Sequence, residues 1–492
     1  QVYEYDILNR TKKSYFVPQS TGAAENHHLI TYDQWGREIS RSGYPDGWGQ
    51  PNEVEETFEY DYLGNLIQYT DPENNQSQYQ YDPLNRLIKV IDPLNQETGY
   101  DYDRLGNVSQ VKQSEGLKDF ITTKGYDERG LLTSKTEPEG QAVSYQYNQS
   151  GLPVTVTDAT GKVTTMEYEN NQRLQGMSAG PDTLTYYYHP LGGVERTAVY
   201  SSQGGAGESL DYGYYSTGLT SQRKISNYAV DFQYDDVGNR TQITDPFNQT
   251  VNYQYDSLNR VDTITADNRQ FSYEYYADGM VKAVNYPNGL RTEYTYDNIN
   301  RLTELINKMG ANILSEFSYA YDKNSNIIAI TSAGQTTTYQ YDPLNRLTGI
   351  KRPNGEEINY SYDSRGNRSK GSITTIDTAN FKAGEFAYNS WDELASFTGS
   401  GSTAYSYDPE GLRIKKDTGT TVTRYFCDNN GLVVAESDGT GQVTAQNIWG
   451  HKALARNIDG NYYYYLYNGH GDVIQILDEA GNTVNSYSYD EW

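Results

Sequence analysis

Carboxylates are the most abundant groups in this sequence that could do chemistry. Its 492 residues contain 65 Asp and Glu against 39 Lys and Arg, which gives a net charge of −26. Paired carboxylates can hydrolyse glycosidic bonds. No spacing singles out one pair, and no Gly-x-Ser-x-Gly, phosphate-loop or dinucleotide-binding motif is present. The acidic balance argues against a protein that binds a nucleic-acid backbone, which would carry basic clusters.

The other reactive side chains are few and scattered. Cys427 is the only cysteine, so it can form neither an internal disulfide nor a Cys-based metal motif. The five histidines form no His-Glu-x-x-His motif. They are His27, His28, His189, His451 and His470. Because a metal site needs converging ligands, each is expected to be solvated or structural. We therefore predict no catalytic, cofactor-binding or metal-binding residue, and no cofactor.

A short unit built on the dipeptide Tyr-Asp recurs along most of the chain, mostly every 19 to 21 residues. Longer gaps coincide with polar or glycine-bearing insertions, such as residues 201–210 and 371–384. The clear copies begin at Tyr60, Tyr81, Tyr102, Tyr126, Tyr234, Tyr255, Tyr296, Tyr321, Tyr341, Tyr362 and Tyr407. The length alone suggests roughly three domains. The period indicates instead about twenty copies of one small unit.

One unit reads clearly over residues 250–268. Apolar and aromatic residues alternate with polar ones from Val251 to Tyr255, which predicts a half-buried strand. The sequence Asp-Ser-Leu-Asn at 256–259 then predicts a turn. Its Asp can accept a backbone N–H bond two residues on, and its Asn tolerates the left-handed conformation that closes a hairpin. A second strand at 260–265 and a second turn complete the unit.

Short strands joined by tight turns predict an antiparallel meander. About forty strands at about 4.8 Å each would make a sheet about 190 Å wide. Open sheets rarely exceed about 10 strands, so this one must roll up. The apolar fraction is about 35% with Gly counted and Tyr left out, against about 45–50% in typical domains. One face cannot then be a dry core throughout, and we expect both faces to be partly wet.

Tyrosine supplies 50 of the 66 aromatic residues. We expect these rings to pack in ladders along the strands, because Tyr is a large amphipathic plate whose hydroxyl can stay in water. Platforms that stack on sugars are the alternative role. The Asp of each Tyr-Asp pair is expected to form the turn, with catalysis or ion binding as the alternative.

The unit Tyr-x-Tyr-Asp-x-Leu/x-Asn/Gly-Arg/Asn-Leu/Val resembles the RHS/YD-repeat family. The closest copies span residues 79–87, 253–261 and 339–347. Residues 462–473 and 477–492 resemble the start of the RHS-associated core. The sequence of this C-terminal part is most similar to wall-associated proteins of Gram-positive bacteria.

The resemblance implies an all-β fold: a long antiparallel meander of tandem hairpins that spirals into a hollow shell. In bacterial polymorphic toxins and toxin-complex C components, such a shell sequesters a C-terminal toxic segment until delivery. In animals, related shells occur in teneurins and serve cell adhesion. The bacterial family also has an aspartyl self-cleavage site, but no residue here matches its aspartates.

The resemblance therefore implies a non-enzymatic, monomeric shell, secreted or at the cell surface of a bacterium. Its partner would be its own C-terminal toxin segment, which this sequence does not contain. It would bind no nucleic acid directly, and a cell wall or surface glycan is a second candidate partner. The chain starts within a repeat and stops before a variable segment, so we expect it to be part of a longer protein.

The sequence allows two alternative functions. A cell-surface adhesion or carbohydrate-binding module would use aromatic repeats of similar length, but the tryptophans do not follow the period. They are Trp35, Trp48, Trp391, Trp449 and Trp492. A β-propeller hydrolase would have four-stranded blades of about 42 residues, but alternate units do not differ as blades would require.

Three segments are expected within one architecture. Residues 1–56 have few clear units and would cap the array, since terminal repeats are usually atypical. Residues 57–424 form the regular repeat. Residues 425–492 form a truncated core-like segment that would close the shell.

Overall fold

The computed structural model describes residues 2–16, 25–46, 53–115, 118–201, 206–371, 385–399 and 401–489. These residues form 45 strands and no helix. In the described ranges there is accordingly no helix long and apolar enough to cross a membrane. The predicted all-β fold is confirmed.

The first sheet has 34 strands. They are β1 (Val2–Tyr5), β2 (Thr11–Phe16), β3 (Glu25–Tyr32), β4 (Glu38–Gly43), β5 (Val54–Tyr60), β6 (Leu66–Thr70), β7 (Gln76–Tyr81), β8 (Leu87–Ile91), β9 (Glu97–Tyr102), β10 (Val108–Glu115), β11 (Lys118–Tyr126), β12 (Leu132–Thr136), β13 (Ala142–Tyr147), β14 (Pro153–Thr157), β15 (Val163–Tyr168), β16 (Leu174–Ala179), β17 (Asp182–Tyr188), β18 (Val194–Ser201), β19 (Ala206–Tyr214), β20 (Thr220–Ile225), β21 (Tyr228–Tyr234), β22 (Arg240–Thr244), β23 (Thr250–Tyr255), β24 (Val261–Ala266), β25 (Arg269–Tyr275), β26 (Val281–Asn285), β27 (Leu290–Tyr296), β28 (Leu302–Met309), β29 (Asn312–Tyr321), β30 (Ile327–Ser332), β31 (Gln335–Tyr341), β32 (Leu347–Lys351), β33 (Glu357–Tyr362) and β34 (Arg368–Gly371).

The second sheet, called the C-terminal sheet below, has 11 strands. They are β35 (Glu385–Tyr388), β36 (Leu394–Thr398), β37 (Ser402–Tyr407), β38 (Arg413–Asp417), β39 (Val422–Cys427), β40 (Val433–Asp438), β41 (Val443–Trp449), β42 (Ala453–Ile458), β43 (Asn461–Tyr467), β44 (Val473–Leu477) and β45 (Thr483–Ser486). The predicted division into segments at 56 and 424 stays a prediction.

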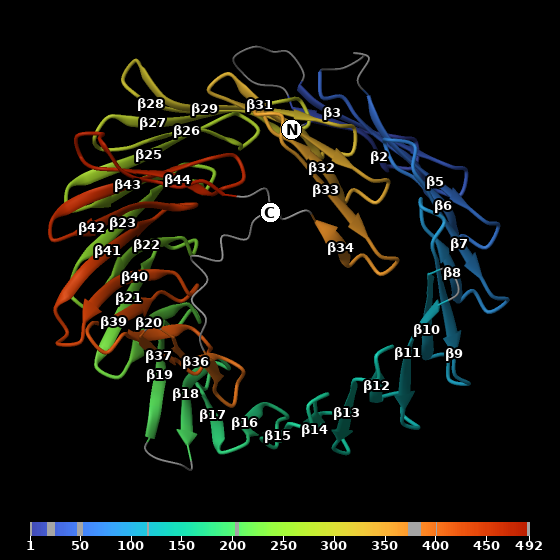
Figure 1. Ribbon diagram of the computed structural model, residues 1–492, viewed down its shortest axis with the longest axis horizontal. Coiled ribbons are helices and arrows are strands. Elements are labelled where there is room, and N and C mark those ends of the chain that lie inside the picture. The colour runs from blue at the N-terminus through green and yellow to red at the C-terminus, as the bar shows by residue number, and fades with distance from the viewer. Residues whose placement is uncertain are drawn as a thin grey trace.

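Each strand pairs antiparallel with the next one in the sequence, from β1 with β2 to β33 with β34 and from β35 with β36 to β44 with β45. The meander follows a ring, and the C-terminal sheet lies over β20–β28 (Figure 1). The predicted meander that curls into a shell is confirmed.

The predicted unit at 250–268 agrees with the structure to within a residue. Its two strands are β23 and β24, and their register shifts between Gln254 and Tyr255, just before the turn. Asn259 has a φ of 59°, the left-handed conformation expected at the fourth turn position. The second turn is shorter and consists of Asp267 and Asn268. Both residues have positive φ (47° and 62°), as a two-residue hairpin turn requires. Other units use the four-residue form.

The ring closes on itself through polar contacts between turns. Asn298 donates its backbone N–H to the Pro45 carbonyl at 3.0 Å, and Asn324 Nδ2 donates to Asp71 Oδ2 at 2.6 Å. The Asn324–Asp71 partners are 253 residues apart. The contacting loops at 45 and 298 follow β4 and β27, so one turn takes 23 strands. At about 4.8 Å per strand, untilted strands would give a perimeter of about 110 Å and a mean diameter of about 35 Å, and the tilt of strands in a closed sheet widens the ring further.

The wall is a single layer in part of the ring and a double layer elsewhere. In β7 the Gln side chains on one face are exposed, and Ser77, Tyr79 and Tyr81 on the other are half-buried. Both faces therefore reach solvent there, as predicted from the composition. Where the C-terminal sheet covers β21–β27, the covered face is buried. A dry core is thus local to the double layer.

Candidate functional site: the shell wall and its closing seam

The Asp of each Tyr-Asp pair organises its own turn. Asp82 Oδ1 accepts backbone N–H bonds from Leu84 at 2.8 Å and from Arg86 at 2.9 Å, and Oδ2 accepts from Arg86 Nε at 2.7 Å. The pKa of Asp82 is lowered, and the main cause is the hydrogen bonds that its carboxylate accepts from Arg86. The same three bonds recur at Asp6, Asp33, Asp256, Asp297 and Asp342. The predicted turn role is confirmed, and both carboxylate oxygens are used in it.

The Tyr of most pairs ties its repeat to the preceding one. Tyr102 donates its hydroxyl to the Leu87 carbonyl at 2.7 Å, and Arg86 lies 4.4 Å above the Tyr102 ring. Each Asp–Arg pair therefore also positions the next tyrosine. The hydroxyl bond recurs at Tyr32, Tyr81, Tyr126, Tyr147, Tyr168, Tyr188, Tyr214, Tyr255, Tyr275, Tyr321, Tyr341, Tyr362, Tyr407, Tyr467 and Tyr489. This bond from the hydroxyl to a carbonyl of the neighbouring strand was not predicted from the sequence.

We expect Tyr147→Phe to lower the free energy of unfolding by about 0.5–1.5 kcal/mol, the net value of one hydrogen bond. The lost bond joins the Tyr147 hydroxyl to the Leu132 carbonyl at 2.8 Å. Tyr145→Phe is the matched control, since Tyr145 lies half-buried on the same strand. Chemical denaturation measures both, and equal losses in the two variants would contradict the tie between repeats.

The C-terminal sheet packs on β21–β27 through a buried cluster. Phe271 of β25 is fully buried, and its ring lies 5.7 Å from Tyr286 and 6.2 Å from Tyr464 of β43. The cluster also contains Val230, Phe232, Ile243, Val251, Tyr253, Ile264, Ala266, Tyr273, Val284, Leu290, Phe426, Val434, Ala435, Ile448, Leu454, Ala455, Tyr462, Leu466 and Leu477. These side chains come from both sheets, so the cluster is the apolar part of a seam between two turns of the spiral.

Tyrosine hydroxyls of the wall also bind backbone groups across this seam. Tyr273 accepts the N–H of His451 at 3.2 Å, and Tyr319 accepts the N–H of Gly469 at 2.6 Å. A Cβ at position 469 would lie 2.5 Å from Tyr319 Cζ. Glycine is therefore needed there for the close approach of the two layers.

Two buried ion pairs join the wall to turns of the C-terminal sheet. Arg223 of β20 binds Asp408, whose side chain is 0% exposed. Arg240 of β22 binds Asp428 at 2.8 Å, and the Asp428 side chain is 1% exposed. Asp408 also accepts N–H bonds from its own turn, from Glu410 at 2.9 Å. The same residue type thus serves a local turn and a long-range contact.

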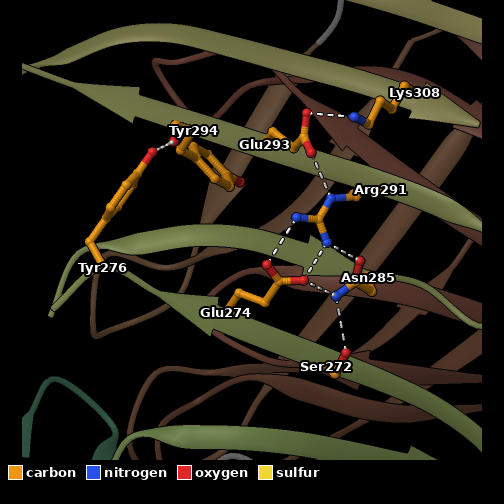
Figure 2. A network of polar contacts seen from close by, with 8 residues as sticks. All are labelled: Ser272, Glu274, Tyr276, Asn285, Arg291, Glu293, Tyr294 and Lys308. Carbon is orange, nitrogen blue, oxygen red and sulfur yellow. Dashed lines mark hydrogen bonds and ion pairs between the residues drawn. The ribbon is translucent and has the colours of Figure 1, made fainter. Parts of the chain in front are cut away.

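A polar network covers the opposite face of β25–β28 (Figure 2). Arg291 binds Glu274 with both terminal nitrogens and Glu293 with Nε at 2.7 Å. Asn285 Nδ2 donates to Glu274 at 3.1 Å, and Lys308 Nζ lies 2.7 Å from Glu293. The hydrogen bond from Arg291 is the main cause that lowers the pKa of Glu274, to about 2. The network crosses four strands and holds the charged face of the wall together.

This network predicts a pH dependence. Because the pKa of Glu274 is lower in the folded chain, its contribution is complete above about 4.3, the usual Glu value. It is lost as the pH falls through about 2. The stability difference between the wild type and Glu274→Gln is expected to shrink over this range, measured by denaturation at each pH. Glu357→Gln, which removes an exposed pair with Lys351, is the control and should show a small effect throughout.

Among the residues that the structure describes, the remaining reactive groups do not come together in a site. Cys427 is buried, and burial raises the pKa of its thiol to about 11, so it is a poor nucleophile. Partial burial is the main cause that lowers the pKa values of His28 and His451. His189 Nδ1 accepts the Leu191 N–H at 3.1 Å and so replaces the turn Asp. In the described part of the chain, no three His, Cys, Asp or Glu side chains converge to hold a metal.

His27 and the tryptophans considered in the sequence lie in different environments. The side chain of His27 lies outside the described residues, and so do Trp48 and Trp492. Trp35 is exposed under Arg37. Trp449 donates Nε1 to the Val433 carbonyl at 2.8 Å, which uses its polar edge inside the C-terminal sheet.

These features define a class of protein: a β-shell built from tandem Tyr-Asp repeats, closed by a second sheet. Comparison of the sequence with known families agrees. Residues 96–289 and 285–492 match the teneurin YD-shell family, and residues 60–97 match the RHS repeat. The chain belongs to the YD-shell family.

Curated relatives include a tRNA3(Ser)-specific nuclease WapA from Bacillus spizizenii. It is 28% identical over 285 residues, which cover 49% of this chain and 12% of the relative. A tRNA(Glu)-specific nuclease WapA from Bacillus subtilis subsp. natto is 35% identical over 151 residues, 29% of this chain and 6% of that protein. The matched region is thus a small part of each relative.

Solved structures agree with the fold. A TcdB2-TccC3 complex aligns over 97% of this chain and 36% of that one, with a TM-score of 0.58 and 14% sequence identity. The toxin-complex pore of Photorhabdus luminescens aligns over 97% of this chain and 34% of that one, with a TM-score of 0.53 and 14% identity.

Proposed function

We propose that this chain is the non-enzymatic shell of a secreted bacterial toxin, and that it sequesters a toxic segment following Trp492 until delivery. The observation that supports this most strongly is the rolled wall closed by a seam. The WapA relatives are named as nucleases, and the matched region covers only a small part of them. A cargo beyond the shell would account for such an activity.

The size of the ring sets a condition on the cargo. With a sheet about 10 Å thick, a mean diameter of about 35 Å leaves an opening of about 25 Å for untilted strands, and a strand tilt of about 40° raises it to about 35 Å. A compact domain of 100 residues has a radius of gyration of about 13 Å, equivalent to a sphere about 34 Å across. A folded cargo of that size would take up the whole opening of one turn of this wall. We infer that the shell holds a larger cargo extended or partly folded, away from its partners and from other unfolded chains.

Protease protection tests this function. A flexible segment with many trypsin sites is fused after Trp492, and the same segment is fused before Gln1 as the control. We expect the C-terminal fusion to be cleaved at least tenfold more slowly than the N-terminal one. Equal cleavage rates, with the wall intact by hydrogen exchange, would overturn the containment role and leave the fold unaffected.

A further inference from the structure

A pocket of about 310 Å³ lies at the seam, between β25–β28 and the C-terminal sheet. Its walls are aromatic and aliphatic: Tyr286, Tyr294 and Tyr296 line one side, and Leu454 and Tyr467 the other. Ligand sites are usually concave, largely apolar, placed between packed layers, and equipped with a few polar groups. The place and lining of this pocket agree with each of these properties.

Two tyrosine hydroxyls in the pocket have no partner. Tyr296 belongs to a Tyr-Asp pair, and in most repeats that hydroxyl is bonded to a carbonyl of the neighbouring strand. Neither Tyr296 nor the half-buried Tyr294 makes a hydroxyl hydrogen bond within the described ranges. Among the described repeats Tyr60 and Tyr234 also lack the bond to the neighbouring strand, so its absence is not special to the pocket. At the pocket it leaves the Tyr294 and Tyr296 hydroxyls available to a ligand.

The charge of the lining is also unusual for this chain. The sequence has 65 acidic residues, yet no carboxylate lines the pocket and Lys452 does. Elsewhere on the wall one pocket is lined by charges of both signs, with Glu56 and Asp71 beside Arg41 and Lys323, and another has only acidic charges, among them Asp322 and Asp342.

The Lys452 ammonium lies 5.1 Å above the Tyr467 ring and forms no ion pair with a described residue. Burial lowers the pKa of Lys452, and the attraction of the nearby Asp472 carboxylate opposes that shift without an ion pair between them. The ammonium can therefore form an ion pair with an anion that enters the pocket.

We propose that this pocket binds a small aromatic carboxylate, with the ring between the tyrosines and the carboxylate on Lys452. Aromatic rings pair with a gain of about 0.5–1.5 kcal/mol beyond their buried area. The Tyr294 and Tyr296 hydroxyls can donate to the carboxylate or to a ring substituent. This site is independent of the containment role.

Fluorine NMR on the full chain tests the proposal, with 4-fluorophenylacetate as the probe and 4-fluorophenylacetamide as its uncharged counterpart. The acid is expected to bind with millimolar affinity or better. Lys452→Met keeps the aliphatic stem and should weaken the acid about tenfold, the value of one hydrogen bond to a charged group. It should leave the amide unchanged. Lys351→Met, an exposed lysine outside the pocket, is the matched control and should change neither.

A second variant tests the place of the ring. Val281 lines the pocket, so Val281→Trp is expected to fill it and abolish binding of both probes. The proposal is overturned if the acid shows no binding at 10 mM, or if it binds Lys452→Met as tightly as wild type. It is also overturned if Val281→Trp, shown to be folded by hydrogen exchange, keeps wild-type binding. Tighter binding of glucuronate than of the aromatic acid would likewise exclude an aromatic ligand.

Discussion

Asp408→Ala is expected to loosen the C-terminal sheet from the wall by about 3–5 kcal/mol, the usual cost of removing one partner of a buried ion pair. The substitution leaves the Arg223 guanidinium buried, with 3% of its side chain exposed. Its remaining acidic neighbour, Glu410, lies 3.7 Å away and is 41% exposed. Hydrogen exchange of β37–β41 should then accelerate about a hundredfold or more, and exchange of β5–β10 should not change.

Two further variants separate the seam from the turn. Arg223→Met removes the cation and leaves the Asp408 turn intact, so it should reproduce the effect on β37–β41. Asp103→Ala removes the same kind of turn carboxylate, with N–H bonds from Leu105 and Asn107 at 2.9 and 2.8 Å, but no seam contact. It should cost about 1 kcal/mol, as a lost side-chain cap does. If Asp103→Ala and Asp408→Ala lose equal stability, the buried pair does not hold the seam.

Phe271→Ala is expected to cost about 3–5 kcal/mol, because it removes a large ring from a packed interior and leaves a cavity. Phe271 is 0% exposed and lies between Tyr286 of the wall and Tyr464 of the C-terminal sheet. Both sheets lose contacts, so β25 and β43 should exchange faster together. Limited proteolysis should also release the C-terminal sheet sooner than in the wild type.

Phe58→Ala is the control in the single-layered wall. Phe58 is half-buried and its ring lies 5.5 Å from Tyr69 on the adjacent strand. A cross-strand pair of this kind is worth about 0.2–1 kcal/mol beyond Ala–Ala, so its loss should be well below that of Phe271. Equal losses at the two positions would mean that the cluster between the sheets adds nothing to ordinary ladder packing.

The repeat unit could be predicted from the sequence because its determinants are local. The alternation from Val251 to Tyr255 and the turn chemistry at Asp256 each act within a few residues, and the structure places the strands as predicted. The tyrosine hydroxyl bond reaches only to the neighbouring strand. The regular spacing between Arg and the following Tyr, as in Arg86 and Tyr102, could have predicted this bond from the sequence.

The seam could not be predicted in the same way. Arg223 and Asp408 are 185 residues apart, and Arg223 belongs to no repeated motif. Which turns of the spiral meet depends on the ring's perimeter, which follows from the number of strands per turn and their twist. Neither the number of strands per turn nor their twist is set by a single segment of the sequence. The pocket at Tyr296 and Lys452 forms only where these two layers meet, so no sequence pattern could predict it.

Electron cryomicroscopy of the chain with a flexible segment fused after Trp492 tests the containment role most directly. We expect a ring-shaped wall with additional density in its centre, which is lost when the fused segment is deleted. A wall with an empty centre and the fused segment outside it, or a filled compact domain in place of the ring, would contradict containment by a hollow shell.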